Sequence, residues 1–231
     1  MQNIELVIFD LDGTLVDTEK DIYISLNLAL EQINLPQISL DTAKKAIGPG
    51  PDEFLRYVLG EEKLHRSEDF RNAFRPIYTH RCADNAKAFD GIDSLLTELK
   101  RLDIKLAIAT NKARTGTDPI LKALDIENFF DIVMTRNDVE KPKPEPDMLL
   151  IACEKLKINP QHALMLGDTD NDILSARSAG IKSCLALWGY SNEMEKLKIL
   201  ADYSVDEPMH VLRILDNETK ENVKDSIFAN L

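Results

Sequence analysis

The chain contains few cysteines, and their spacing excludes two classes of protein. Cys82, Cys153 and Cys184 are the only cysteines among 231 residues, and no two of them form a CxxC pair. This number and spacing argue against a disulfide framework and against a zinc site. A reducing compartment is the expected setting, so we predict a cytoplasmic protein.

A long apolar run is also missing. The apolar segment at residues 4–9 contains Glu5 and stops at Asp10, and no basic segment precedes it. This pattern argues against a signal peptide and against a membrane span. The sequence has no internal repeat and no low-complexity tract.

Basic residues are in the minority, at 28 against 40 acidic residues, which gives a net charge of -12. A surface of this charge repels phosphate backbones and anionic lipids, so we expect neither nucleic acid nor a membrane as a partner. An anionic metabolite would need a bound cation and local lysines to overcome the same field.

Short apolar segments alternate with helical patterns along most of the chain. The segments predicted as buried strands are residues 4–9, 106–109, 130–134, 163–166 and 183–187. Between them, apolar residues at i, i+3 and i+4 predict helices that face a core, at residues 92–102, 120–124, 148–156 and 173–179. The alternation predicts an α/β fold with a doubly wound parallel sheet.

One stretch interrupts this alternation. Residues 17–87 show helical patterns and no convincing strand. We therefore predict a discontinuous α/β core, residues 1–16 and 88–215, with an inserted α-helical subdomain at 17–87. Linkers near residues 14–18 and 85–91 would form a hinge, and residues 216–231 would form a polar tail.

Two aspartates follow the first predicted strand, in the sequence Asp10-Leu11-Asp12-Gly13-Thr14. Residues i and i+2 of an extended chain point the same way, so both carboxylates can face one site. The carboxyl edge of a doubly wound sheet is where ligands bind. Two close carboxylates whose pKa values are pushed apart suit one nucleophile and one proton carrier. The alternative is an ordinary turn.

A second acidic cluster, residues 167–172, follows the fourth predicted strand. Asp168 comes just after that strand, and Asp172 comes at the start of the next helix. One of these aspartates could simply cap the helix. Three carboxylates among six residues exceed that need. Oxygen ligands at this density suit Mg²⁺, and the cluster contains no His or Cys that would indicate a transition metal.

Polar and basic residues mark two further positions. Thr110, Asn111 and Lys112 follow the second predicted strand and could hold phosphate oxygens. Lys141 and Lys143 stand in a proline-rich segment before a helix, and one of them would offset the charge of a bound phosphate. The alternatives are a helix N-cap for the first group and a rigid surface loop with solvated lysines for the second.

These four segments, in this order, resemble the four sequence motifs of the haloacid dehalogenase superfamily. Residues 10–14 resemble its DxDGT motif, Thr110 its Thr/Ser motif, residues 141–143 its lysine motif and residues 167–172 its GDxxxD motif. The resemblance extends from residue 4 to about residue 215. Four ordered motifs are far more specific than any one alone.

The resemblance implies a magnesium-dependent phosphatase that forms an aspartyl-phosphate. Asp10 would attack phosphorus, and Asp12 would protonate the leaving oxygen and then activate water. Mg²⁺ would be held by Asp10, the carbonyl of Asp12 and Asp168, with Asp172 direct or through water. A carboxylate that attacks an anion needs such cations to offset repulsion.

Thr110 and one lysine would hold the phosphoryl group. Read from Lys141, the proline-rich segment resembles phosphoglycolate phosphatases; read from Lys143, it resembles β-phosphoglucomutases. We predict Lys141 as the catalytic lysine. The expected phosphate- and substrate-binding residues are Leu11, Asn111, Lys112, Lys143 and Gly48.

The helical insert resembles the small cap of the phosphoglycolate phosphatase-like branch. Such a cap would close over the site, exclude water and select the leaving group. Residues 47–51, around Gly48, resemble the specificity loop of this branch, and Trp188-Gly189-Tyr190 also resembles it. A plain turn between helices is the alternative for the loop.

The predicted function is hydrolysis of a small phosphomonoester such as phosphoglycolate, by a monomer or homodimer. A sugar phosphomutase, a pyrophosphatase and a nucleotidase are the enzymatic alternatives. A non-catalytic regulatory protein is disfavoured because all the expected catalytic residues are present. Carbon–halogen cleavage is disfavoured because the dehalogenases lack an acid/base aspartate at the position of Asp12.

Overall fold

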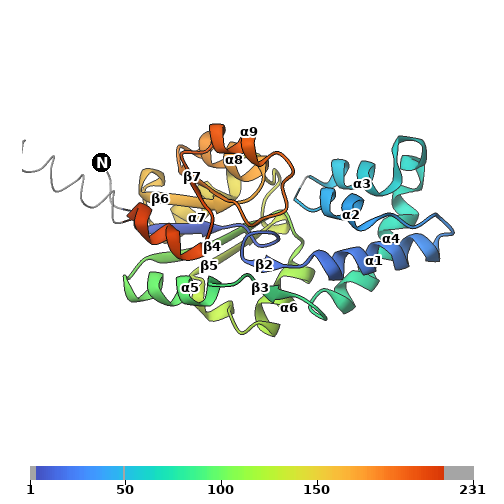
Figure 1. Ribbon diagram of the computed structural model, residues 1–231, viewed down its shortest axis with the longest axis horizontal. Coiled ribbons are helices and arrows are strands. Elements are labelled where there is room, and N and C mark those ends of the chain that lie inside the picture. The colour runs from blue at the N-terminus through green and yellow to red at the C-terminus, as the bar shows by residue number, and fades with distance from the viewer. Residues whose placement is uncertain (1–3, 49, 216–231) are drawn as a thin grey trace, which may run out of the picture.

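The computed structural model describes residues 4–48 and 50–215, so the predicted tail at 216–231 and Pro49 of the predicted specificity loop lie outside the described residues. A parallel sheet forms the centre of the molecule, with six strands in the order β5-β4-β1-β6-β7-β8 (Figure 1). The strands are β1 (Leu6–Phe9), β4 (Lys105–Thr110), β5 (Ile132–Thr135), β6 (Ala163–Gly167), β7 (Lys182–Ala186) and β8 (Tyr203–Val205).

The strand order confirms the predicted doubly wound sheet. From β1 the chain proceeds to β4 and β5 on one side, and then returns to β6, β7 and β8 on the other. All five predicted strands are present. The sequence did not indicate β8, because this three-residue edge strand contributes only one fully buried residue, Val205.

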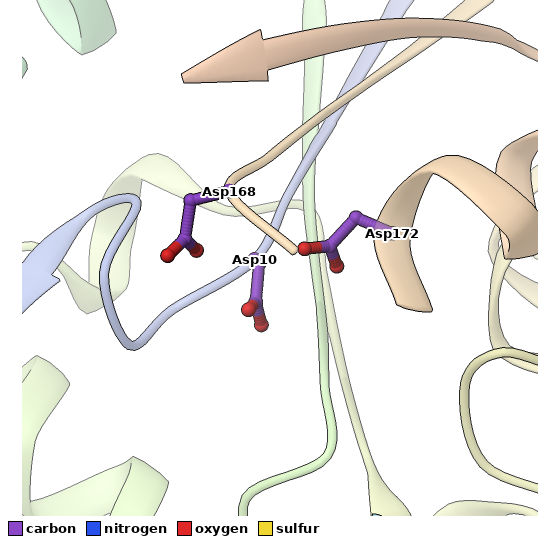
Figure 2. Close-up of side chains that lie close together, drawn as sticks. All are labelled: Asp10, Asp168 and Asp172. Carbon is purple, nitrogen blue, oxygen red and sulfur yellow. The ribbon is translucent and has the colours of Figure 1, made fainter. Parts of the chain in front are cut away.

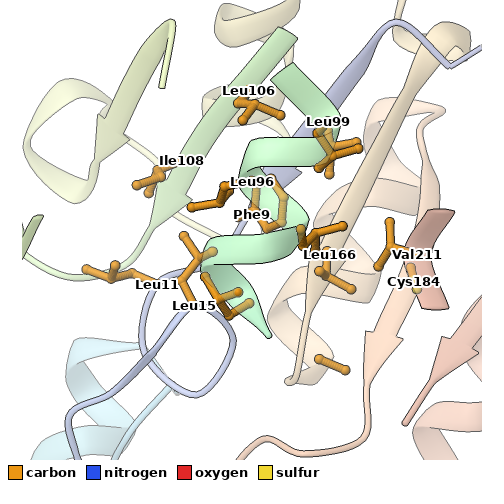
Figure 3. Packing of buried hydrophobic residues seen from close by; sticks show 14 of the residues in the cluster. Phe9, Leu11, Leu15, Leu96, Leu99, Leu106, Ile108, Leu166, Cys184 and Val211 are labelled. Atoms are coloured by element: carbon orange, nitrogen blue, oxygen red, sulfur yellow. The ribbon is translucent and has the colours of Figure 1, made fainter. Parts of the chain in front are cut away.

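Both faces of the sheet are covered by helices. Side chains of β1 alternate: Val7 and Phe9 belong to a cluster with α5 (Ile92–Arg101) and α6 (Arg114–Ala123), part of which is shown in Figure 3. Leu6 and Ile8 belong to a second cluster, on the opposite face. The helices of that face are α7 (Asp147–Leu156) and α8 (Asp170–Ala179). A parallel sheet buried on both faces explains why its strands read as continuous apolar runs.

The insertion after β1 is helical, as the sequence indicates. It contains α1 (Glu19–Gln32), α2 (Leu40–Lys45), α3 (Pro51–Leu59) and α4 (Ser67–Arg81), and these helices lie to one side of the sheet (Figure 1). They enclose an apolar cluster of their own that includes Leu26, Leu30 and Phe70. We call these four helices the cap; the division at residues 17 and 87 stays a prediction.

The two linkers to the cap pair with each other. They form an antiparallel ribbon of β2 (Val16–Asp17) and β3 (Lys87–Ala88). Each strand is only two residues long, which is too short to leave a pattern in the sequence. Further elements are α9 (Met194–Leu200), a helical segment at residues 211–215, and the 3₁₀ turns Glu61–Arg66, Glu127–Phe129, Arg136–Asp138, Pro160–His162 and Pro208–His210.

The structure also bears on the predictions made from the cysteines and from the missing long apolar run. Cys82, Cys153 and Cys184 are all buried free thiols. Across residues 4–48 and 50–215, none of the helices combines the length and the apolarity needed to cross a bilayer.

Candidate active site

Asp10 stands at the end of the strand where the winding of the sheet reverses. In β1, Phe9 is in register with Ile108 of β4 and with Leu166 of β6. The backbone N–H of Asp10 donates to the carbonyl of Leu166 over 2.9 Å. Asp10 therefore lies between the two halves of the sheet, at the point where doubly wound folds bind ligands.

Three buried carboxylates converge at this point. Figure 2 shows Asp10 between Asp168, which follows β6, and Asp172, which lies in the first turn of α8. One oxygen from each carboxylate lies within 4.8 Å of the others. The structure thus brings together three of the aspartates that the sequence indicated as metal ligands.

Asp168 is fixed by neutral donors from two loops. Thr14 Oγ1 donates to Asp168 Oδ1 over 3.0 Å, and the backbone N–H of Tyr190 donates to Oδ2 over 2.8 Å. Gly13 has φ of +82°, and a Cβ atom there would stand 2.4 Å from Asp168 Oδ2. Only glycine fits this position, which is the physical reason for the Gly in the first motif.

Asp172 has two functions in the structure. Its Oδ2 accepts hydrogen bonds from the backbone N–H of Thr169 over 3.0 Å and from Thr169 Oγ1 over 2.8 Å. The helix-capping alternative therefore holds for Asp172. Its Oδ1 faces the site and accepts a hydrogen bond from Lys143 Nζ over 2.6 Å.

Lys143, and not Lys141, enters the site. Lys143 Nζ lies 3.0 Å from Asp10 Oδ1, and the Lys143 side chain is 2% exposed. Lys141 lies exposed on the same loop. The predicted placement of Lys141 beside the nucleophile was therefore wrong. Asn111 explains the choice, because its Nδ2 donates to the backbone carbonyl of Lys143 over 2.9 Å and holds the loop in position.

Burial and charge crowding perturb the groups of this site. Burial raises the pKa of Asp10, Lys143 lowers it, and Asp172 and Asp12 raise it again, with a net upward shift. Burial and the neighbouring carboxylates also raise the pKa of Asp168. Burial alone would lower the pKa of Lys143, but its two carboxylate partners raise it. The lysine is therefore charged, but its single positive charge does not balance the negative charge of the neighbouring carboxylates.

This charge balance suits a divalent cation. Within the described residues, Lys143 is the one cationic side chain that forms an ion pair with any of the three carboxylates, and its partners are Asp10 and Asp172. Three carboxylates against one ammonium leave an excess of negative charge in a buried space. A divalent cation held by Asp10 and Asp168, with Asp172 behind them, would offset that excess and lower the raised pKa values.

Asp12 faces a different partner. Lys112 Nζ donates to both Asp12 oxygens over 2.8 Å, and Thr18 Oγ1 donates to Asp12 Oδ1 over 2.6 Å. Lys112 also lies over the ring of Tyr78 in the cap, 4.8 Å from the centroid. Lys112, expected to bind phosphate, is thus the ion-pair partner of Asp12 and connects it to the cap.

The other expected residues take varied positions. Thr110 ends β4 and is buried, with its Oγ1 accepting from the backbone N–H of Lys112 over 3.1 Å. The Leu11 side chain lies in the apolar core, and its carbonyl accepts from Val16 N over 2.9 Å.

Gly48 connects the cap to the core. Its carbonyl accepts from Asn171 Nδ2 over 2.9 Å, and its φ is +99°. A Cβ atom at Gly48 would stand 2.7 Å from Thr169 Cγ2. The loop therefore rests directly on the start of α8, and glycine is needed for this close approach.

A cavity of about 660 Å³ opens beside Asp12, between the cap and the core. Asp12, Asn111 and Lys112 line it from the core, and Phe54, Phe74 and Tyr78 line it from the cap. A bound molecule would therefore contact the acidic motif and the cap at the same time.

Three further residues contact the site without belonging to any of the four sequence motifs. Thr18 and Tyr78 contact Asp12 and Lys112 as described above. Tyr190 Oη donates to Asp17 Oδ1 over 2.8 Å and accepts from the backbone N–H of Thr18 over 2.8 Å, at the start of α1. Sequence analysis indicates Trp188-Gly189-Tyr190 only by its resemblance to the phosphoglycolate phosphatase-like branch. The contacts of Tyr190 with the hinge join residues more than 170 positions apart in sequence, so no local pattern predicts them.

Comparison with known proteins shows what the chain is similar to. The family model described as haloacid dehalogenase-like hydrolase matches residues 7–186. A phosphoglycolate phosphatase from Aquifex aeolicus is 33% identical, over 94% of this chain and 99% of its own length. An N-acetylmuramic acid 6-phosphate phosphatase from Pseudomonas aeruginosa is 30% identical, over 92% of this chain and 95% of its own.

A solved structure shares the whole architecture. The crystal structure described as a predicted phosphoglycolate phosphatase from Haemophilus somnus superposes with a TM-score of 0.84 at 29% identity. The match covers 93% of this chain and 99% of that one, so the cap is included in the likeness.

Proposed function

Because the chain belongs to the haloacid dehalogenase-like hydrolases and is a phosphatase by its relatives, we propose that it hydrolyses small phosphomonoesters through an aspartyl-phosphate on Asp10. One observation carries the proposal. Asp10 Oδ1 lies 3.0 Å from Lys143 Nζ, at the switch point of the sheet and among three buried carboxylates. A carboxylate in this position can approach a phosphate only if its own charge is offset.

Asp10 is the proposed nucleophile. In the first step an oxygen of Asp10 forms a bond to phosphorus, and the bond from phosphorus to the leaving oxygen breaks. In the second step water attacks phosphorus, the bond to Asp10 breaks, and inorganic phosphate leaves. Lys143 lowers the negative charge that Asp10 presents to the incoming phosphate and would stabilise the charge that develops during transfer.

Asp12 is the proposed proton carrier. It would give a proton to the leaving oxygen in the first step and take one from water in the second. Its position at the cavity wall supports this assignment, because the leaving group must occupy that cavity. Lys112 and Thr18 hold the Asp12 carboxylate and so act as positioning residues.

Thr110 and the backbone N–H of Leu11 are proposed to hold oxygens of the phosphoryl group. Asn111 is proposed to position the Lys143 loop, since its Nδ2 is already engaged by the Lys143 carbonyl. For Gly48 we propose a function in docking the cap on the core rather than direct substrate binding, because its carbonyl bonds to Asn171.

Mg²⁺ is the metal that we propose for the carboxylate cluster. All its ligands would be oxygens, from Asp10, Asp168 and the Asp12 carbonyl, with Asp172 direct or through water, and such a set matches the preference of Mg²⁺. When bound, the ion would supply positive charge to the phosphate and to the attacking carboxylate. Asp172 already holds Lys143 and the start of α8, so its larger contribution is to position the lysine.

Phosphoglycolate is the first substrate to test, because the Aquifex aeolicus relative carries that name. A cytoplasmic setting is proposed from the three buried free thiols. The decisive experiment is a steady-state assay of phosphate release from phosphoglycolate and p-nitrophenyl phosphate, with and without Mg²⁺. Release that requires Mg²⁺ and disappears in the Asp10→Asn variant supports the proposal. The proposal is wrong if Asp10→Asn retains full activity.

A further inference from the structure

Helix α4 presents an aromatic stripe to the cavity. Phe70, Phe74 and Tyr78 follow one another at four-residue spacing and stack, with ring centroids 5.5 Å apart for the first pair and 5.2 Å for the second. Arg71 and Arg75 stand one residue later in the same spacing, so they form a second stripe beside the first. All five residues line the cavity.

The arginines around this cavity differ from most others in the chain. Within the described residues, the guanidinium groups of Arg71, Arg75 and Arg136 form no ion pair and no hydrogen bond. The arginines that pair with a carboxylate, each within 3.2 Å, are Arg56, Arg66, Arg81, Arg101 and Arg114. In a protein with a net charge of -12, three unpaired guanidinium groups at one cavity need an explanation.

The charge of the cavity is opposite to that of the protein. Its charged lining residues are Arg71, Arg75, Lys112, Arg136, Asp12 and Asp52. Lys112 is paired with Asp12, so three guanidinium groups face one remaining carboxylate. Such a pocket attracts an anion into a surface that otherwise repels anions.

The positions of the residues along α4 indicate which part of a bound molecule each residue would contact. Tyr78 lies over Lys112, which holds Asp12, so the reacting end lies at the Tyr78 end of the helix. Arg75 and Arg71 lie about 4.5 Å and about 10 Å further along the helix axis, at a rise of about 1.5 Å per residue. An anion that meets these arginines is therefore separated from the reacting phosphate by a body lying against Phe74 and Tyr78.

We propose that the leaving group carries a second anion, a carboxylate or a phosphate, on an apolar or planar body. Arg71 and Arg75, with Arg136 from the core, recognise that anion, since guanidinium groups bind carboxylate and phosphate in a bidentate manner. The aromatic stripe of α4 contacts the body. This inference rests on the proposed phosphatase function and specifies its substrate class. Phosphoglycolate carries the second anion but has little body, so it is the smallest member of the class.

Three aryl phosphates test the inference. p-Nitrophenyl phosphate has the planar ring without an anion, 4-carboxyphenyl phosphate adds a carboxylate, and 1,4-phenylene bisphosphate adds a phosphate. We would measure kcat/KM with Mg²⁺ for the wild type and for Arg71→Ala, Arg75→Ala and Arg136→Ala. Arg177→Ala is the matched control, because Arg177 is exposed on α8 and lies outside the cavity lining. The ratio of variant to wild type cancels differences in leaving-group chemistry.

The expected result is selective. At least Arg71→Ala or Arg75→Ala should lower kcat/KM by about 10- to 100-fold for a substrate with the second anion, and change it by less than about twofold for p-nitrophenyl phosphate. The carboxylate and bisphosphate arms identify which anion is preferred. Equal losses on all three substrates, or losses no larger than those of Arg177→Ala, overturn the inference while leaving the phosphatase function intact. A wild type that hydrolyses phosphoglycolate but none of the three overturns the inference alone, and a wild type that hydrolyses neither phosphoglycolate nor any of the three overturns both.

Discussion

Lys143 Nζ lies 3.0 Å from Asp10 Oδ1, with both side chains almost fully buried. The same ammonium donates to Asp172 Oδ1 over 2.6 Å, so one lysine joins the end of β1 to the start of α8. The contact places positive charge beside the proposed nucleophile, which then requires less from a metal to accept an anionic phosphate.

This contact makes the two lysines of one loop behave differently. Lys143→Ala should lower kcat by about 100- to 1,000-fold, in line with the loss of a transition-state donor. Lys141→Ala removes an exposed lysine from the same loop and should stay within about twofold of the wild type. Steady-state phosphate release with Mg²⁺ measures both. A larger loss for Lys141→Ala would show that the loop has another arrangement in the working enzyme.

Asp168 should control metal affinity. Asp168→Ala should raise the Mg²⁺ concentration for half-maximal activity by about 10-fold or more, because it removes one of the buried carboxylates that would hold the ion. Asp170→Ala changes an exposed carboxylate two residues away and serves as control. Calorimetric titration of Mg²⁺ without substrate provides a reading that is independent of turnover. Equal affinities for the two variants would remove Asp168 from the metal site.

Asp12 should matter most for poor leaving groups. An alkoxide needs a proton as it departs, whereas nitrophenolate leaves without one. Asp12→Asn should therefore lower kcat/KM for phosphoglycolate by about 100-fold or more, and should have a clearly smaller effect on kcat/KM for p-nitrophenyl phosphate. The comparison uses kcat/KM because this constant reports the first irreversible step. Equal losses on both substrates would argue that Asp12 only supports the structure of the loop.

The sequence predicts the parts of this molecule that depend on local patterns. Asp10 and Asp168 could be placed because each follows a buried strand, and parallel strands end at one edge of the sheet. The helical insertion and the five core strands could be predicted because their apolar residues recur in local patterns. The edge strand β8 and the ribbon of β2 and β3 are too short to have a period.

Contacts between distant segments lie beyond such patterns. Lys141 and Lys143 are two residues apart in a loop without periodicity, and the Asn111 amide that selects Lys143 lies 32 residues away in sequence. The pairing of Lys112 with Asp12 joins residues 100 positions apart, and Tyr78 reaches Lys112 from the cap. The sequence likewise does not show that Arg71, Arg75 and Arg136 share one cavity, because they lie on α4 and just after β5, which are far apart in the chain.

The central claim is that phosphate is transferred to Asp10, and the covalent intermediate can be trapped directly. Rapid mixing of enzyme with substrate and Mg²⁺, an acid quench and reduction with borohydride would convert an aspartyl-phosphate to homoserine. Peptide mass spectrometry then identifies the modified position. We expect homoserine at position 10 in the wild type and no modification in Asp10→Asn. Turnover without any modified residue, or modification at another aspartate, would contradict it.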